Sequence, residues 1–320
     1  MPTDSQIPQT QKRKMAYCLL SNDVETTSIW HNTLRDKTGV KVYEEGMPAL
    51  LDLYAKHDIK TTFFFTGYIA KLIPDVVKMV LEGGHEVGSH GMSHLKENGF
   101  DVMPFKKQVE HLRDSKHLLE DISGHEVISF RAPALRVNAD TAKALIETGY
   151  KIDSSVASQR FDMFLSFGGL KKLNWLTAPR QPYYVSEANL FNKGKSDLIE
   201  VPLSAMMLPY VGTTMRIMPT LTAAQRSILA AESKRTGKPI VFIVHPNEFI
   251  DESDEERKIQ NRSSNPVSYF LQDYVRSNLK VKNLGKPGLE IYDREISAFK
   301  KKDFRFVTIK NYVEELNLSK

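Results

Sequence analysis

Short apolar runs alternate with amphipathic segments along most of this 320-residue chain. Continuous β-rich runs such as TTFFF at 61–65 and IVFIV at 240–244 are typical of parallel strands covered on both faces. Between such runs, apolar positions such as Met47, Leu50 and Tyr54 recur at helical spacing. The pattern predicts strands at 15–21, 61–65, 86–88, 128–130, 151–153, 240–244 and 305–308, and helices at 74–81, from Thr222, at 290–301 and at 311–316. The alternation is typical of an α/β fold.

Three regions depart from this rhythm. Residues 1–14 are polar and predict a disordered lead-in. Residues 156–194 form a long irregular stretch, and 251–288 begins with the acidic run DESDEER. Because long loops in compact domains are usually functional or disordered, we interpret both stretches as excursions from one domain over 15–320.

Two histidines provide the strongest chemical signal. His90 and His94 are four residues apart in SHGMSH, directly after a predicted strand. That spacing places both imidazoles on one face of a helix, where they can bind one metal ion. A surface helix is the alternative, and the position after a strand favours the metal site.

Acidic residues end the first predicted strand in the sequence SNDVET. Asp23 and Glu25 are two positions apart, so on a strand they share a face and can point into one pocket. One could bind a metal ion and the other could act as a base, and the residues alone do not decide which. A solvated turn is the alternative for this motif taken alone.

Polar residues also follow later predicted strands. Arg131 lies in FRAPA and could hold a carboxylate in fixed geometry, Asp153 begins DSS, and His245 follows IVFIV. Each alone has a structural alternative, such as a surface ion pair. Their occurrence at successive strand ends predicts a common site, because the carboxyl ends of parallel strands meet at one edge of the sheet.

Composition narrows the classes of function. The net charge of +5 is diffuse, and no dense basic helix predicts binding to nucleic acid. A single cysteine, Cys18, excludes an intramolecular disulfide, and no segment has the ~20 apolar residues of a membrane span. Residues 15–20 are too short for the core of a signal peptide. We therefore expect a cytoplasmic protein.

Taken in order, the motifs SNDVET, SHGMSH, RAP, DSS and IVH resemble those of the polysaccharide deacetylase superfamily, also called carbohydrate esterase family 4 or the NodB-homology domain. The resemblance covers nearly all of residues 15–316. It implies a distorted (β/α) barrel of about seven strands and one divalent ion, commonly zinc. It also implies hydrolysis of N-acetyl groups on glucosamine-type sugars.

The resemblance also implies roles for individual residues. Glu25, His90 and His94 would hold the ion, although Asp23 and Glu25 could exchange roles. Asp23 would be the base, fixed by Arg131, and His245 the proton donor, oriented by Asp153. Ala134 stands where many members have an aromatic residue, and its backbone N–H would contact the oxyanion.

The substrate is less constrained. A cytoplasmic member would act on a precursor, lipid-linked or nucleotide-linked, and two features favour the lipid-linked form. Residues 206–218 are rich in methionine and could form an apolar lip or pack in the core, and residues 269–282 could rest on the inner face of a membrane or against the barrel. Deformylation of a lipid-linked formamido sugar and inactive carbohydrate binding on the same fold are the alternatives to deacetylation.

Overall fold

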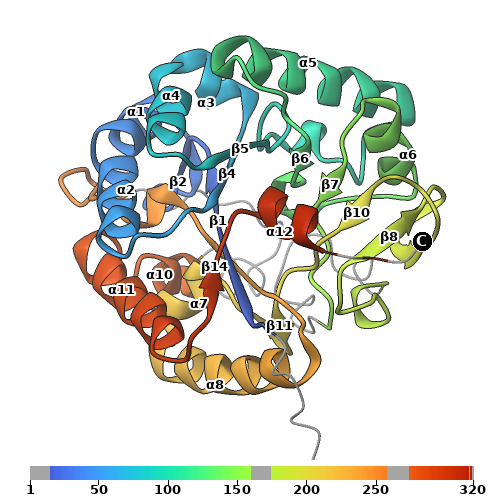
Figure 1. The fold of residues 1–320 in the computed structure, drawn as a ribbon. Coiled ribbons are helices and arrows are strands. Elements are labelled where there is room, and N and C mark those ends of the chain that lie inside the picture. Colours follow the sequence, from blue (N-terminus) through green and yellow to red (C-terminus); the bar gives the residue numbers. More distant parts are fainter. Residues whose placement is uncertain (1–14, 160–173, 258–273, 317, 319–320) are drawn as a thin grey trace, which may run out of the picture.

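The computed structural model describes residues 15–159, 174–257, 274–316 and 318, so the predicted lead-in at 1–14 lies outside the described residues. A curved sheet forms the centre of the protein (Figure 1). Its parallel part has the strand order β13-β1-β4-β5-β6-β7-β10. These strands are β13 (Ile240–Val244), β1 (Tyr17–Val24), β4 (Thr62–Phe65), β5 (Glu86–Ser89), β6 (Ser129–Phe130), β7 (Ile152–Asp153) and β10 (Ile199–Glu200). The predicted α/β class and curved (β/α) architecture are confirmed.

Helices surround the sheet, as Figure 1 shows. They are α1 (Asp36–Lys41), α2 (Met47–Lys56), α3 (Gly67–Leu72), α4 (Asp75–Glu82), α5 (Phe105–Ser123), α6 (Asp140–Glu147), α7 (Gly212–Ile217), α8 (Pro219–Thr236), α10 (Arg276–Lys280), α11 (Lys286–Lys300) and α12 (Ile309–Glu315). Because the helices cover the sheet, strands such as β4 and β13 are buried at every position. This double coverage explains why those strands are continuous apolar runs in the sequence.

The remaining strands extend or close the sheet. From β10 onward, β8 (Tyr183–Ser186) and β9 (Asn189–Lys193) pair antiparallel. The chain that follows β10 returns to β13, where the Ser204 N–H donates to the Val241 carbonyl at 3.2 Å. β14 (Arg305–Phe306) pairs with the start of β1. Short antiparallel pairs are formed by β2 (Thr27–Ser28) with β3 (Thr33–Leu34) and by β11 (Ala205–Met206) with β12 (Leu208–Pro209).

Two helix starts differ from the sequence prediction by three or more residues. α8 begins at Pro219, not at Thr222, because proline suits the first helical turn and the Thr222 hydroxyl bonds back to the Met218 carbonyl at 3.1 Å. α11 begins at Lys286, four residues before the predicted start, directly after Gly285 with its φ of +66°.

Residues 206–218 and 269–282 were the two regions considered for lipid or membrane contact. Met215 is buried, whereas Met207 is 72% exposed at the tip of the β11–β12 hairpin, so the methionine-rich stretch has both core and surface positions. Residues 269–273 of the second region lie outside the described residues. In the parts of the chain that the structure describes, no helix is both long and apolar enough to span a bilayer.

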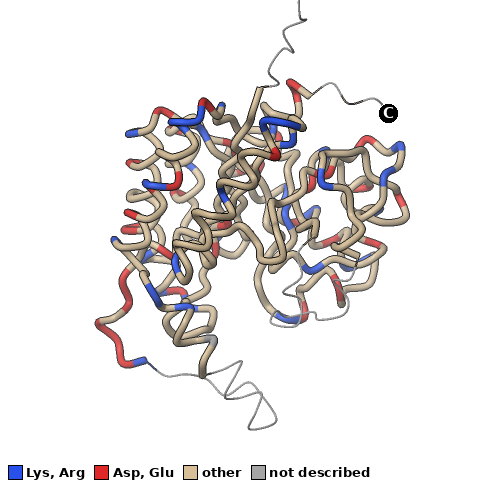
Figure 2. The backbone as a smooth tube through the Cα atoms, turned by 90° about the horizontal axis from the view of Figure 1, so that it is seen from below, with Lys and Arg blue, Asp and Glu red and all other residues tan. Residues whose placement is uncertain are grey.

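Charged residues are interspersed along the backbone (Figure 2). The acidic run after β13 stands out in that view. Glu252 accepts hydrogen bonds from Ser28 and Thr38, both at 2.6 Å, and Glu255 pairs with Arg35 at 2.6 Å. The first part of the 251–288 excursion is therefore tied to the barrel by its carboxylates.

Candidate active site

Strand β1 carries the acidic part of the site to the carboxyl edge of the sheet. Side chains alternate across a strand, so Ser21, Asp23 and Glu25 point to the same side. Asn22 points to the opposite side, where its amide donates to Thr61 at 3.2 Å. Asp23 and Glu25 are 4% and 6% exposed, so both carboxylates are nearly removed from water.

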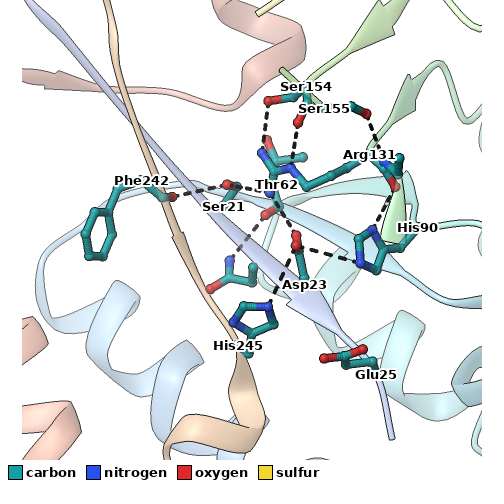
Figure 3. A network of polar contacts seen from close by, with 12 residues as sticks. Ser21, Asp23, Glu25, Thr62, His90, Arg131, Ser154, Ser155, Phe242 and His245 are labelled. Atoms are coloured by element: carbon teal, nitrogen blue, oxygen red, sulfur yellow. Dashed lines mark hydrogen bonds and ion pairs between the residues drawn. The ribbon is translucent and has the colours of Figure 1, made fainter. Parts of the chain in front are cut away.

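Arg131 follows β6 and fixes Asp23 (Figure 3). Its Nη1 donates to Asp23 Oδ1 at 2.8 Å and to the Ser21 hydroxyl at 2.9 Å. Its Nε and Nη2 donate to the carbonyl and hydroxyl of Ser154, both at 3.0 Å. The guanidinium also lies 4.3 Å from the centre of the Phe64 ring. Burial opposes ionisation of Asp23, but Arg131, assisted by His90 and His245, lowers the pKa of this carboxyl.

The two histidines of SHGMSH converge, although they do not lie on a helix as the sequence predicted. Residues 90–94 form an irregular loop after β5, which turns at Gly91 with a φ of +65°. His90 Nε2 and His94 Nε2 lie 2.9 Å apart. The turn at Gly91 thus brings the two imidazoles together, as four-residue spacing on a helix would have done.

Glu25 completes this cluster of nitrogen and oxygen donors. Its Oε2 lies 2.6 Å from His94 Nε2 but, within the described part of the chain, accepts no hydrogen bond of acceptable geometry. Burial opposes ionisation, yet His94 and the other histidines lower the pKa of Glu25 to about 2. A buried, ionised oxygen of this kind is well suited to a cation.

The tautomer of His90 is fixed by the backbone. Its Nδ1 lies 2.7 Å from the Arg131 carbonyl, which can only accept, so Nδ1 carries the proton and Nε2 presents a lone pair. Burial lowers the pKa of His90 to about 4, despite the opposing effect of Asp23. At neutral pH the ring is therefore uncharged, as metal ligation requires.

The chemistry of this donor set, one carboxylate oxygen and two imidazole nitrogens, suits zinc or a similar divalent ion. Their contacts of 2.6 and 2.9 Å are closer than the roughly 3.3 Å expected between ligand atoms around a tetrahedral zinc. Accordingly, the described residues contain no group of three or more His, Cys, Asp or Glu side chains already spaced for a metal. To reach that spacing, the Glu25–His94 contact would have to lengthen by about 0.7 Å and the His90–His94 contact by about 0.4 Å.

His245 faces Asp23 from β13, the neighbouring strand. Its Nε2 lies 3.9 Å from Asp23 Oδ2, and its Nδ1 lies 3.9 Å from Glu248 Oε2. Burial disfavours the charged ring, but Glu248, Asp23 and Glu25 raise the pKa of His245 to about 9. The imidazole is therefore a cation at neutral pH and can donate a proton.

Asp153, which the sequence analysis expected to orient His245, has its contacts with Ser155 and Glu200. It accepts a hydrogen bond from Ser155 at 2.6 Å and lies against Glu200, another buried carboxyl. Burial raises the pKa of Asp153, and burial together with Asp153 raises that of Glu200 well above its usual range. The carboxylate beside His245 is Glu248, which the sequence analysis missed although it lies three residues after the histidine.

Ala134 lies in a short 3₁₀ turn, Pro133–Leu135, just after Arg131. Its φ of +52° is unusual for alanine, and the residue is exposed. The exposed turn starts from a fixed position, because the preceding Ala132 N–H donates to the Ser155 hydroxyl at 2.9 Å.

A cavity of about 490 Å³ opens beside the donor cluster, with Glu25 and His94 in its wall. Leu34, Leu95 and the half-exposed Tyr68 form apolar parts of its lining. The Tyr68 hydroxyl donates to Asp36 at 2.7 Å, which holds the ring in place. The volume is that of a site for a small organic ligand. Tyr68 was not identified from the sequence, because an aromatic residue in a short helix carries no signal of its own.

Part of the chain is similar in sequence to known proteins. Residues 33–152 match the family model for polysaccharide deacetylase. Over 123 residues the chain is 32% identical to a peptidoglycan deacetylase of Helicobacter pylori, which covers 38% of this chain and 41% of that protein. The matched segment thus spans about two fifths of this curated relative.

Solved structures share the fold across nearly the whole chain. A Pseudomonas aeruginosa PAO1 protein assigned to the polysaccharide deacetylases has a TM-score of 0.59 at 12% identity, over 93% of this chain and 89% of that one. One from Mycobacterium smegmatis has a TM-score of 0.54 at 16% identity, over 95% and 96%. Residues 33–152 are therefore similar to the polysaccharide deacetylase family, and the fold is similar to that of these solved structures over nearly the whole chain.

Proposed function

We propose that this protein is a metal-dependent hydrolase that removes an N-acetyl group from an amino sugar of a glycan or glycan precursor. The observation that carries the proposal is the placement of three groups at one edge of the sheet. They are the Arg131-bound carboxylate of Asp23, the cationic His245 and the donor cluster of Glu25, His90 and His94.

Glu25, His90 and His94 would hold one divalent ion, most simply zinc. Such an ion supplies Lewis acidity, which lowers the pKa of water toward ~7 and polarises an amide carbonyl. Asp23 is left as the base, because Arg131 holds one of its oxygens and favours its ionised form. The buried Oε2 of Glu25, which lies 2.6 Å from His94 Nε2, supports its assignment as the ligand.

His245 is the proton donor in this proposal. Hydrolysis of an amide expels an amine, which leaves only when its nitrogen is protonated. His245 is charged at neutral pH and lies within 4 Å of Asp23, so acid and base occupy adjacent positions. The backbone N–H of Ala134 is our candidate for an additional contact to the oxyanion, worth roughly 10²–10³ in rate if it is made.

The cavity beside Glu25 and His94 would receive the acylamino sugar, with Tyr68 and Leu95 against its apolar surfaces. The lipid-linked precursor remains our proposal from the sequence, and Met207 at an exposed hairpin tip is compatible with it.

The test is the identity of the acid released. Purified protein is supplied with zinc and incubated with an N-acetylglucosamine oligosaccharide, and with acetylated and formylated lipid-linked amino sugars. The proposal expects acetate and free amine in equal amounts, and release that is slower by roughly 10²–10⁴-fold after Asp23→Asn. Formate alone would instead identify a deformylase, and zinc binding without release of either acid would support a carbohydrate-binding protein.

A further inference from the structure

A second carboxylate, that of Glu248, lies next to His245. β13 ends at Val244, and a 3₁₀ turn, Pro246–Glu248, folds the chain back. The turn is closed by the Glu248 N–H donating to the His245 carbonyl at 2.9 Å. Glu248 Oε2 accepts from the His245 backbone N–H at 3.1 Å and lies 3.9 Å from its ring Nδ1. One carboxylate oxygen thus contacts the histidine through both backbone and ring.

The other oxygen of Glu248 is held by α7. Arg216 donates to Oε1 through Nε at 3.2 Å and Nη2 at 3.1 Å, and the Thr213 hydroxyl donates at 3.0 Å. Arg216 and Glu248 are both completely buried. Oε1 therefore accepts hydrogen bonds from α7, and Oε2 faces His245. Because each oxygen has its own partners, the orientation of the carboxylate is fixed.

Arg216 is itself fixed from its far side. Its Nη1 donates to the carbonyls of Lys280 and Lys282, at 2.9 and 2.8 Å, and its own carbonyl accepts from Asn283 at 2.7 Å. The guanidinium cannot follow Glu248 if the carboxylate shifts, because these contacts hold it to the chain before α11. The anchor therefore joins three segments distant in the sequence.

Gly212 leaves the space that this arrangement needs. A Cβ at this position would lie 2.0 Å from Glu248 Oε2 and 3.1 Å from Val244. Any side chain would displace the oxygen that faces His245. Substitution of Gly212 would therefore displace the Glu248 carboxylate while leaving the glutamate itself unchanged.

The charged groups that face the His245 ring come from two elements. Asp23 and Glu25 approach from the end of β1, and Glu248 approaches from the turn after β13. Glu248 contributes the largest of the effects that favour the cation, ahead of Asp23 and Glu25. It lies on the side of Nδ1, leaving Nε2 directed toward Asp23.

We propose that Glu248, anchored by Arg216, is the positioning residue that holds the His245 ring with Nε2 toward the reaction and stabilises its protonated form. This inference rests on the proposed function, in which His245 donates a proton to the leaving amine. It assigns to Glu248 the part that the motif order assigned to Asp153. Glu248 Oε2 lies 3.9 Å from the ring Nδ1, whereas Asp153 contacts Ser155 and Glu200.

The experiment compares Glu248→Gln with Glu295→Gln in the full-length protein. Glutamine keeps the size of the side chain and removes its charge. Glu295 is a matched control, because it is buried and bonded to Tyr210 and Arg226 outside the site. The His245 ring is titrated by NMR with labelled histidine, its signal assigned by its loss in His245→Gln, and the pH profile of kcat/KM is recorded in parallel.

For Glu248→Gln we expect the pKa of His245 to fall by roughly 1–3 units and the basic limb of the profile to move with it. kcat should fall by about 10²-fold, with a smaller change in KM. Glu295→Gln should leave the titration and both constants near wild type. A His245 pKa that is unchanged in Glu248→Gln, or that moves equally in Glu295→Gln, overturns the proposal.

Two further measurements keep the proposal testable if Glu248→Gln does not fold. Gly212→Ala should lower the pKa of His245 in the same direction, because the carboxylate is pushed away. In the wild-type protein, a His245 pKa at or below 6.5 would also overturn it. The titration needs no substrate, so a protein that releases no acid yet shows these shifts would contradict the proposed function and retain the role of Glu248.

Discussion

Arg131 Nη1 lies 2.8 Å from Asp23 Oδ1, and both side chains are buried. Removing one partner of a buried ion pair leaves the other charge uncompensated, at a cost of about 3–5 kcal/mol. Here the serine partners of Arg131 remain when Asp23 is neutralised. The chemistry and the fold can therefore be tested separately at this position.

Asp23→Asn should lower kcat by roughly 10²–10⁴-fold, because asparagine keeps the hydrogen bond to Arg131 but cannot accept a proton. The variant should be less stable to denaturant and should still bind metal. Rates, denaturant unfolding and elemental analysis of the purified protein check the three expectations. Full activity in a metal-loaded Asp23→Asn protein would show that another group is the base.

His90→Ala should remove bound metal and activity together, since it deletes a nitrogen whose lone pair is fixed toward His94 and Glu25. Inductively coupled plasma mass spectrometry measures the metal. His85→Gln is the control, because this buried histidine lies before β5, at the opposite end of the strand from His90. Equal metal content in wild type and His90→Ala would refute the ligand set.

Tyr68→Ala should raise KM by about tenfold and change kcat little, because the ring lines the cavity but is not among the proposed acid, base and metal ligands. Tyr68→Phe keeps the ring and loses the hydrogen bond to Asp36, so its KM should stay near wild type. Steady-state kinetics distinguish the two variants. A loss of kcat in Tyr68→Ala at unchanged KM would place the tyrosine in the chemistry instead.

His85 should make the protein sensitive to acid. Burial, with a smaller effect from Lys60, lowers the pKa of His85 to about 4, and its Nδ1 accepts from the Thr61 N–H. As the pH falls from about 6.5 to 4, the unfolded chain binds a proton that the folded chain does not. The free energy of unfolding should therefore fall, by at most about 1.4 kcal/mol for each pH unit from this group.

Denaturant unfolding between pH 7 and 4 measures this effect. His85→Gln should show a shallower decline than wild type, and the difference should disappear above pH 7. Because burial also lowers the pKa of His111 to about 4, some decline should persist in the variant. Identical slopes for both proteins would mean that His85 is protonated in the folded state.

Much of the sheet and the composition of the site follow from the sequence. Strands buried on both faces are continuous apolar runs, and polar residues at their carboxyl ends are brought to one edge by parallel pairing. Asp23, Arg131 and His245 could be placed in a common site for this reason. The distances between these three residues depend on the pairing of the strands, and the hydrophobic pattern predicts those strands well.

The remaining features depend on local backbone geometry that the pattern does not contain. His90 and His94 converge through a loop, because Gly91 adopts a positive φ that helical spacing does not reveal. Glu248 reaches His245 through a 3₁₀ turn, whereas Asp153 is turned toward Glu200. The sequence did contain a signal for the contact between Glu248 and His245. A glutamate three residues after a strand-end histidine can fold its side chain back and accept a hydrogen bond from the first N–H of the turn.

Two residues of the site come from distant parts of the chain: Asp23 lies in β1 and His245 directly follows β13, and these two strands pair side by side. The segment matched by the family, 33–152, contains His90, His94 and Arg131 but neither of these two. Contacts so distant in sequence form late and slowly during folding. A growing chain therefore acquires the proposed base early and the proposed acid much later, so that a truncated product ending before β13 would lack the proton donor of the proposed reaction.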